Sequence, residues 1–417
     1  MNLNPICSLS DRCQGSHFGM KFTLGPGVMV AAAFVGPGTV TTASVAGASS
    51  GISLLWAVAI SVLATIVLQE LSIRSALSTN QDLAPLIRRF GHDRGWAVPV
   101  AILILCSVGM GNAAYQSGNL VGAALGLSGA TPINFLFAVL GAGTVAAVLI
   151  VVDRYRLLER VMLILVGLMT FALMCLAIAC LPELMPARRA VIANAPTVDV
   201  TLVLALIGTT VVPYNLFLHA TAVRRRWSGV VLPDALREAR IESVFAISMG
   251  GVVTAAIMIV ATVVIAGDTS RPALEALQMG IDQRFPGAGH WAIGMGLFAA
   301  GLTSAIAAPV AAGWAVCGVM GWDSSSGSKA FKGVALAVLG IGMTFALFAA
   351  RPVALIVLAQ ATNAVLLPFV ALVLLAIVNS PLIPDDYRNG SRQNLMAAGV
   401  IVVVLTLAVI KLFSVLG

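Results

Sequence analysis

Four residues, Gly36, Pro37, Gly38 and Thr39, interrupt a long apolar run within the stretch AFVGPGTVTTAS at positions 33–44. Proline supplies no backbone N–H, glycine permits unusual dihedral angles, and Thr39 can cap a helix that restarts after the break. Amide donors and the positive end of a half-helix dipole would then face a bound solute. The chemistry predicted here is reversible binding of a group rich in hydrogen-bond acceptors.

A second interruption lies in IGTTVVPYNLFLHA, at positions 207–220. One proline or glycine in an apolar helix is usually a packing kink. Two interrupted helices, each opening a set of five, are instead typical of an inverted-repeat transporter with its binding site at the breaks. The candidate residues at the second break are Thr209, Val212, Pro213 and Tyr214.

Apolar helices must position both breaks. Hydrophobic residues make up 59% of the 417 residues and charged residues 10%. Runs of about 20 apolar residues, enough to cross a hydrocarbon layer, recur along the chain, and the alternating pattern of a β-barrel is absent from them. We therefore predict an all-α integral membrane protein with eleven spans, at about 24–49, 52–77, 96–127, 133–152, 158–182, 200–223, 242–267, 288–320, 331–350, 352–379 and 394–416.

The basic residues predict the orientation of the chain. With alternating loops, 18 of the 24 lysines and arginines fall on one side, which the positive-inside rule assigns to the cytosol. Residues 1–23 then form a cytosolic tail and the C-terminus lies outside a plasma (inner) membrane. The basic stretch at 224–226 is interpreted as a membrane anchor, so the predicted partner is the lipid bilayer and no nucleic acid.

Four segments carry a family resemblance. The segment at 25–74 resembles the first two helices of the NRAMP family of divalent-metal transporters; TTVVPYNLFLHATAV (209–223), AAGLTSAIAAPVAAG (299–313) and LAQATNAVLLPF (358–369) resemble its sixth, eighth and tenth helices. The resemblance implies a LeuT-type fold in one transporter domain, 24–417. It would hold two inverted five-helix repeats (about 24–182 and 200–379), an eleventh helix (394–416), and helices 1 and 6 broken at the midplane.

The metal ligands of that family are not retained. Its first helix carries Asp-Pro-Gly-Asn, where this chain has Gly36-Pro37-Gly38-Thr39, and its sixth carries Ala-Thr-Val-Met-Pro-His, where this chain has residues 209–214. Of the recognisable ligands only Gln360, in the tenth helix, remains. In the third helix, two family acids implicated in proton movement are replaced by Gln116 and Asn119.

Two functional classes follow, and a third stays open. We expect first a secondary transporter for a small anionic or neutral organic solute, because neither break offers a carboxylate to an ammonium group or a metal. The alternative is a proton-coupled importer of manganese, iron or magnesium, and the third is a non-transporting sensor or scaffold. No enzyme motif, cofactor site or metal-ligand spacing stands out.

Two ionisable groups inside predicted spans allow more than one interpretation. His219 is either a packing histidine or a carrier of a coupling proton. Glu70 lies four residues before Arg74, which predicts an ion pair along one helix face and not an ion site.

Overall fold

The computed structural model describes residues 25–152, 155–194, 200–265, 273–348 and 367–416, and the described residues form helices and no strands. Eight of these helices are long and apolar enough to cross a membrane. Two shorter apolar helices, Phe135–Val151 and Leu367–Val378, fall in two further predicted spans. The first two predicted spans run together over Pro37–Thr79, so helix is found in every one of the eleven segments, as far as each is described.

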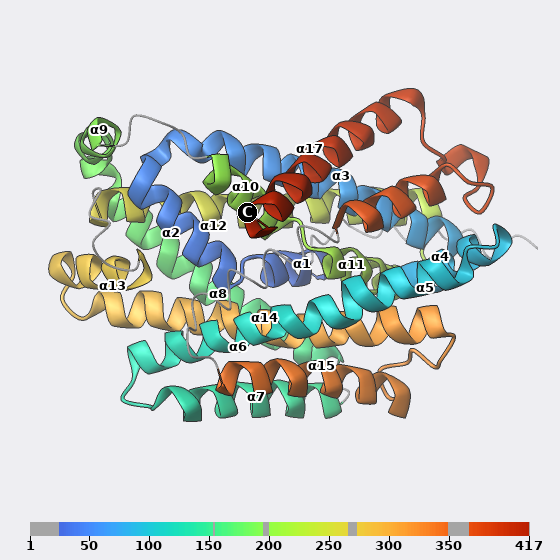
Figure 1. The fold of residues 1–417 in the computed structure, drawn as a ribbon, viewed down its shortest axis with the longest axis horizontal. Coiled ribbons are helices and arrows are strands. Elements are labelled where there is room, and N and C mark those ends of the chain that lie inside the picture. The colour runs from blue at the N-terminus through green and yellow to red at the C-terminus, as the bar shows by residue number, and fades with distance from the viewer. Residues whose placement is uncertain (1–24, 153–154, 195–199, 266–272, 349–366, 417) are drawn as a thin grey trace, which may run out of the picture.

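The helices run in the following order along the chain (Figure 1). The first half contains α1 (Pro26–Phe34), α2 (Pro37–Ser50), η1 (Gly51–Leu54), α3 (Leu55–Thr79), α4 (Leu83–Asp93), α5 (Ala97–Ile104), η2 (Leu105–Met110), α6 (Gly111–Ala130), α7 (Phe135–Val151), α8 (Tyr155–Cys180), η3 (Leu181–Glu183) and α9 (Leu184–Asn194). The second half contains α10 (Val200–Thr210), α11 (Pro213–Arg226), α12 (Leu232–Ile265), α13 (Ala273–Arg284), α14 (Ala288–Met320), α15 (Lys329–Leu347), the helix Leu367–Val378, η4 (Asp385–Tyr387) and α17 (Ser391–Leu416).

Both predicted breaks are confirmed, and they share one local cause. Pro37 and Pro213 each occupy the first turn of a new helix, where a missing N–H costs nothing. The residue before each proline is extended, as the proline ring requires: Gly36 has φ −94° and ψ −177°, and Val212 has φ −110° and ψ 130°. An apolar run therefore stops and restarts at both places.

The broken helices occupy the middle of the molecule. In Figure 1, α1 and α11 lie between α3 and α17 on one side and α6 and α14 on the other. Contacts join α1 to α11, α12 and α14, and α11 also contacts α3. The two breaks thus face surrounding helices and not lipid.

Several features were not predicted. Helix α12 begins at Leu232, ten residues before the predicted span at 242. The prediction missed these ten residues because the first turns of the helix are polar. The short helices α4, α9 and α13 fall outside the predicted spans. Helices α5 and α6 join through η2, a single π-helical segment. Such π-helical segments often lie close to functional sites, and this one leads directly into the helix that carries Gln116 and Asn119.

Candidate functional site

The two breaks are tied together by hydroxyl groups. The Tyr214 hydroxyl, in the first turn of α11, donates to the carbonyl oxygen of Ala33 near the end of α1, at 3.0 Å. The Ser304 hydroxyl of α14 donates to the same carbonyl at 3.2 Å. A helix end leaves its last carbonyls without intrahelical partners, so these bonds satisfy one of them. Tyr214, predicted to bind solute, therefore uses its proton to hold the end of α1.

The space beside Gly36 is lined by neutral oxygens. A β-carbon placed on Gly36 would lie 2.9 Å from Ser304 Oγ and 3.8 Å from Tyr115 Oη. Tyr115 in turn packs against Tyr214, with ring centroids 5.7 Å apart. We call Tyr115, Tyr214 and Ser304 the hydroxyl cluster. Tyr115 and Ser304 were not predicted, because they come from α6 and α14 and reach the break only through packing.

The start of α2 is tightly packed. A β-carbon on Gly122 of α6 would lie 2.1 Å from Cγ of Pro37, so only glycine lets α6 approach the break this closely. Thr39 is fully buried, and the Val40 amide donates to Gly36 O at 3.1 Å. The amide donors that we predicted at Gly38 to Thr41 are therefore partly used within the protein.

At the second break, Thr209 turns back onto its own helix. Its hydroxyl donates to Leu206 O at 3.0 Å, and Val212 is buried as the extended residue before Pro213. Gln360 lies outside the described residues, so its place relative to the two breaks stays a prediction.

Gln116 and Asn119 lie one turn apart on α6, and Gln116 links this helix to α14. Gln116 Nε2 donates to Ala305 O of α14 at 3.0 Å, and Asn119 Nδ2 donates to Gln116 Oε1 at 3.4 Å. One turn earlier, Asn112 Nδ2 donates to Ala308 O at 2.9 Å. These amides form a ladder along the α6–α14 contact, and a role in a polar pathway stays a prediction.

His219 and Asn215 lie one turn apart on α11, and both are buried. Nδ1 of His219 lies 2.9 Å from Oε1 of Gln69 on α3. Among the described residues, Nε2 of His219 and both side-chain polar atoms of Asn215 have no hydrogen-bond partner. Buried polar groups are nearly always paired, so these atoms call for a partner other than the described residues. Asn215 was not predicted, although it stands two residues after Pro213.

The structure corrects the account of acidic residues. The Glu70–Arg74 ion pair is confirmed, at 3.0 Å, and Arg240 joins Glu70 at 2.6 Å. A second acid, which was not predicted, also lies inside a long apolar helix. Glu242 of α12 is only 4% exposed, and its Oε1 accepts hydrogen bonds from the Gly25 amide at 2.6 Å and the Gly27 amide at 3.1 Å. This carboxylate caps the N-terminus of α1.

No group of three or more His, Cys, Asp or Glu side chains that could hold a metal ion occurs in the described parts of the chain. Around the breaks, the donors are hydroxyl, amide and carbonyl groups. Any metal bound there would be held by hard, neutral oxygens, without the soft sulfur that helps to select a transition ion.

Comparisons with known proteins agree with the arrangement of helices. The family model for natural resistance-associated macrophage protein-like (Nramp) proteins matches residues 27–414. A divalent metal cation transporter MntH of Nostoc is 24% identical over 381 residues, covering 88% of this chain and 84% of that protein. An MntH of Brucella suis is 29% identical over 266 residues, which cover 59% of this chain but only 55% of that protein.

A solved structure extends the likeness to three dimensions. The manganese transporter of Eremococcus coleocola, in complex with an aromatic bis-isothiourea substituted compound, superposes with a TM-score of 0.76 at 20% identity. The match covers 98% of this chain and 91% of that one. At this level of identity, the likeness shows a common fold.

Proposed function

This chain belongs to the natural resistance-associated macrophage protein-like family, and we propose that it works by alternating access and that its cargo is a divalent cation held mainly by neutral oxygen atoms. The chain is a multi-pass membrane protein with the LeuT-type fold. MntH relatives carry the name divalent metal cation transporter. These names favour a metal ion as cargo over the organic solute that we expected first from the sequence. We therefore propose the metal ion as the main candidate and the organic solute as the second.

The unpaired amide of Asn215 carries the proposal. It is buried in the first turn of α11, and neither Oδ1 nor Nδ2 has a partner among the described residues. A carboxamide oxygen is a suitable ligand for a hard cation. The hydroxyl cluster supplies further oxygens around the other break.

The absence of an acid among these residues limits what kind of cation fits. A divalent ion stripped of its water would lose more hydration free energy than it gains from its interactions with neutral protein groups. An ion that keeps several water ligands, as magnesium does, needs fewer protein oxygens and no sulfur. We therefore favour a partly hydrated cation. As part of the same proposal, a proton or another cation couples to the transport of the cargo. The N-terminus lies in the cytosol.

An organic anion is the second candidate, because the first turn of α2 contains no acidic residue. The positive end of that half-helix is therefore not neutralised by its own side chains, and a carboxylate could bind there.

Uptake into proteoliposomes tests the proposal. Purified protein is assayed for saturable uptake of manganese, magnesium and a set of small carboxylates, with Asn215→Ala as the site variant. Asn379→Ala is the matched control, since Asn379 is an exposed asparagine at the end of another helix. Cation uptake that is lost only in Asn215→Ala supports the proposal. Carboxylate uptake without cation uptake would show that the cargo is an organic anion. Binding of a cation or a carboxylate without uptake of either would show that the protein is a sensor.

A further inference from the structure

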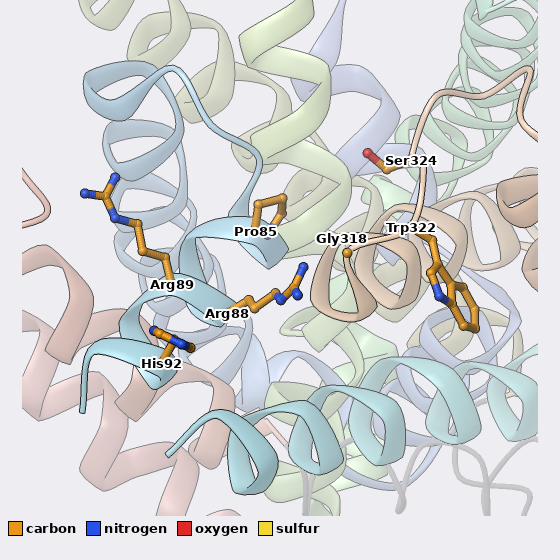
Figure 2. Close-up of a pocket in the computed structure, with 8 residues that line it drawn as sticks. Pro85, Arg88, Arg89, His92, Gly318, Trp322 and Ser324 are labelled. Atoms are coloured by element: carbon orange, nitrogen blue, oxygen red, sulfur yellow. The ribbon is translucent and has the colours of Figure 1, made fainter. Parts of the chain in front are cut away.

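A cavity of about 440 Å³ lies outside the two breaks, between α4 and the end of α14. Its lining includes two arginines and a histidine of α4, namely Arg88, Arg89 and His92, together with Trp322 and Ser324. In Figure 2, Arg88 points from α4 towards Gly318, whereas the Arg89 side chain extends from the same helix away from Gly318. In the part of the chain that the structure describes, no carboxylate lines this cavity.

The two arginines differ from other basic residues on the same predicted face. Arg74 and Arg240 pair with Glu70, Arg224 pairs with Asp82, and Arg94 lies over the Phe90 ring. Among the described residues, Arg88 and Arg89 make no ion pair or hydrogen bond. Two guanidinium groups at one cavity therefore lack a counter-charge from the protein.

Arg88 is not required to cap α14. The last carbonyls of that helix, on Cys317 and Gly318, already accept bonds from the amides of Trp322 at 2.8 Å and Gly321 at 3.3 Å. Gly321 has φ 75°, and a β-carbon there would lie 1.8 Å from an Arg88 nitrogen. The left-handed glycine therefore ends the helix and also makes room for the guanidinium.

The surroundings place the cavity at a membrane surface. Helix α4 buries its apolar residues Leu86, Ile87 and Phe90 in the protein and exposes its arginines. Trp96 and Trp322 are 59% and 50% exposed at the ends of neighbouring spans, and exposed tryptophans mark the level of the lipid headgroups. The positive-inside bias puts this face towards the cytosol.

Two acids adjoin the cavity. Asp93 lies 4.0 Å from His92, with both side chains exposed. Asp323 follows Trp322, and hydrogen bonds from the amide and side chain of Ser325 lower its pKa, so it is an anion at neutral pH. Neither side chain lines the cavity, and the three basic side chains outnumber them.

We propose that this cavity binds the phosphate headgroup of an anionic membrane phospholipid through Arg88 and Arg89. Basic pockets between membrane helices on the cytoplasmic side suit such headgroups, and each arginine near the surface contributes about 1 kcal/mol. Removing one arginine should weaken binding about fivefold, and removing both about 25-fold. The proposal does not depend on the identity of the cargo.

The test uses full-length protein in nanodiscs of phosphatidylcholine alone or with added phosphatidylglycerol. We expect phosphatidylglycerol to raise the melting temperature of the wild type, because a ligand that binds the folded state stabilises it. Arg88→Gln/Arg89→Gln should lose most of this shift. Arg94→Gln is the matched control, because it removes the same charge just after the end of α4, outside the cavity, and should keep the shift.

A second variant covers the case in which the double mutant does not fold. Ser324→Asp keeps both arginines but adds a negative charge to the cavity, and it should also reduce the shift. Inorganic phosphate, added to protein in lipid-free detergent, separates the two sources of phosphate. Stabilisation by free phosphate that requires Arg88 and Arg89, without any effect of phosphatidylglycerol, would overturn the lipid assignment. Equal lipid shifts in wild type, double mutant and Ser324→Asp would overturn the site.

Discussion

Nδ1 of His219 lies 2.9 Å from Oε1 of Gln69, joining α11 to α3 beside the second break. Since a carboxamide oxygen accepts, this contact fixes the imidazole with its proton on Nδ1 and leaves Nε2 as an acceptor. Nε2 is buried and has no hydrogen-bond partner among the described residues.

If a coupling proton is carried on this nitrogen, His219→Gln should reduce the dependence of uptake on pH, because a glutamine side chain cannot take up a proton there. Gln69→Ala removes the partner but keeps the imidazole, so some pH dependence should remain. The measurement is initial uptake rate against pH in proteoliposomes. An unchanged pH profile for His219→Gln would assign coupling to another group.

Gly36→Asp should raise the affinity for manganese or magnesium about tenfold or more, since it adds a hard, charged oxygen ligand among neutral ones. The change needs Ser304 to rotate away, because its Oγ lies 2.9 Å from the new β-carbon. Gly36→Ala controls for this displacement and should bring no gain. Isothermal titration calorimetry of both variants makes the comparison. If the cargo is an organic anion, Gly36→Asp should instead abolish its binding through repulsion.

Tyr214→Phe should lower the stability by about 1 kcal/mol, the typical loss for one buried hydrogen bond. Ser304 still donates to Ala33 O, so the carbonyl stays satisfied and the loss should be modest. Tyr214→Phe combined with Ser304→Ala leaves that carbonyl without a donor. The double mutant should therefore lose more stability than the sum of the losses in the two single mutants. Thermal unfolding of the four proteins in one detergent measures the coupling.

Glu242→Ala should destabilise the protein by about 1–3 kcal/mol, because the Gly25 and Gly27 amides lose a buried acceptor. Limited proteolysis near residue 25 should become faster, since α1 loses its cap. Glu275→Gln, at an exposed position in α13, serves as the control and should behave as wild type. Unchanged proteolysis in Glu242→Ala would show that packing alone holds α1.

The sequence predicted the helices and both breaks because these depend on local properties. A proline after an extended residue ends a helix wherever it occurs, and apolar length defines a span. The hydroxyl cluster depends on tertiary contacts: Ser304 and Tyr115 are separated from Gly36 by whole helices, and nothing in their neighbours marks them. Tyr214 was placed correctly at the break, but its partner Ala33 could not be foreseen.

Glu242 shows why the polar edge of a span is easily missed. The segment before it, LPDALREARI (232–241), contains enough charge to look like a loop, so the predicted helix began at Glu242 itself. The structure shows that α12 extends through this segment. A buried acid then lies inside the helix, in contact with the N-terminus of α1, more than 200 residues away in sequence.

Helix α12 touches both halves of the first broken helix through glycines. A β-carbon on Gly27 of α1 would lie 3.1 Å from Glu242 O, and one on Gly47 of α2 would lie 2.4 Å from Met258 O. The two contacts are about 24 Å apart along one continuous helix, from its rise per residue. One continuous helix therefore packs against both α1 and α2, on either side of the break. The Gly47 contact is backbone against backbone, whereas the Gly27 end is secured by two hydrogen bonds to a carboxylate. The first broken helix therefore meets α12 through two kinds of contact: close backbone packing at α2, and hydrogen bonds to a buried carboxylate at α1.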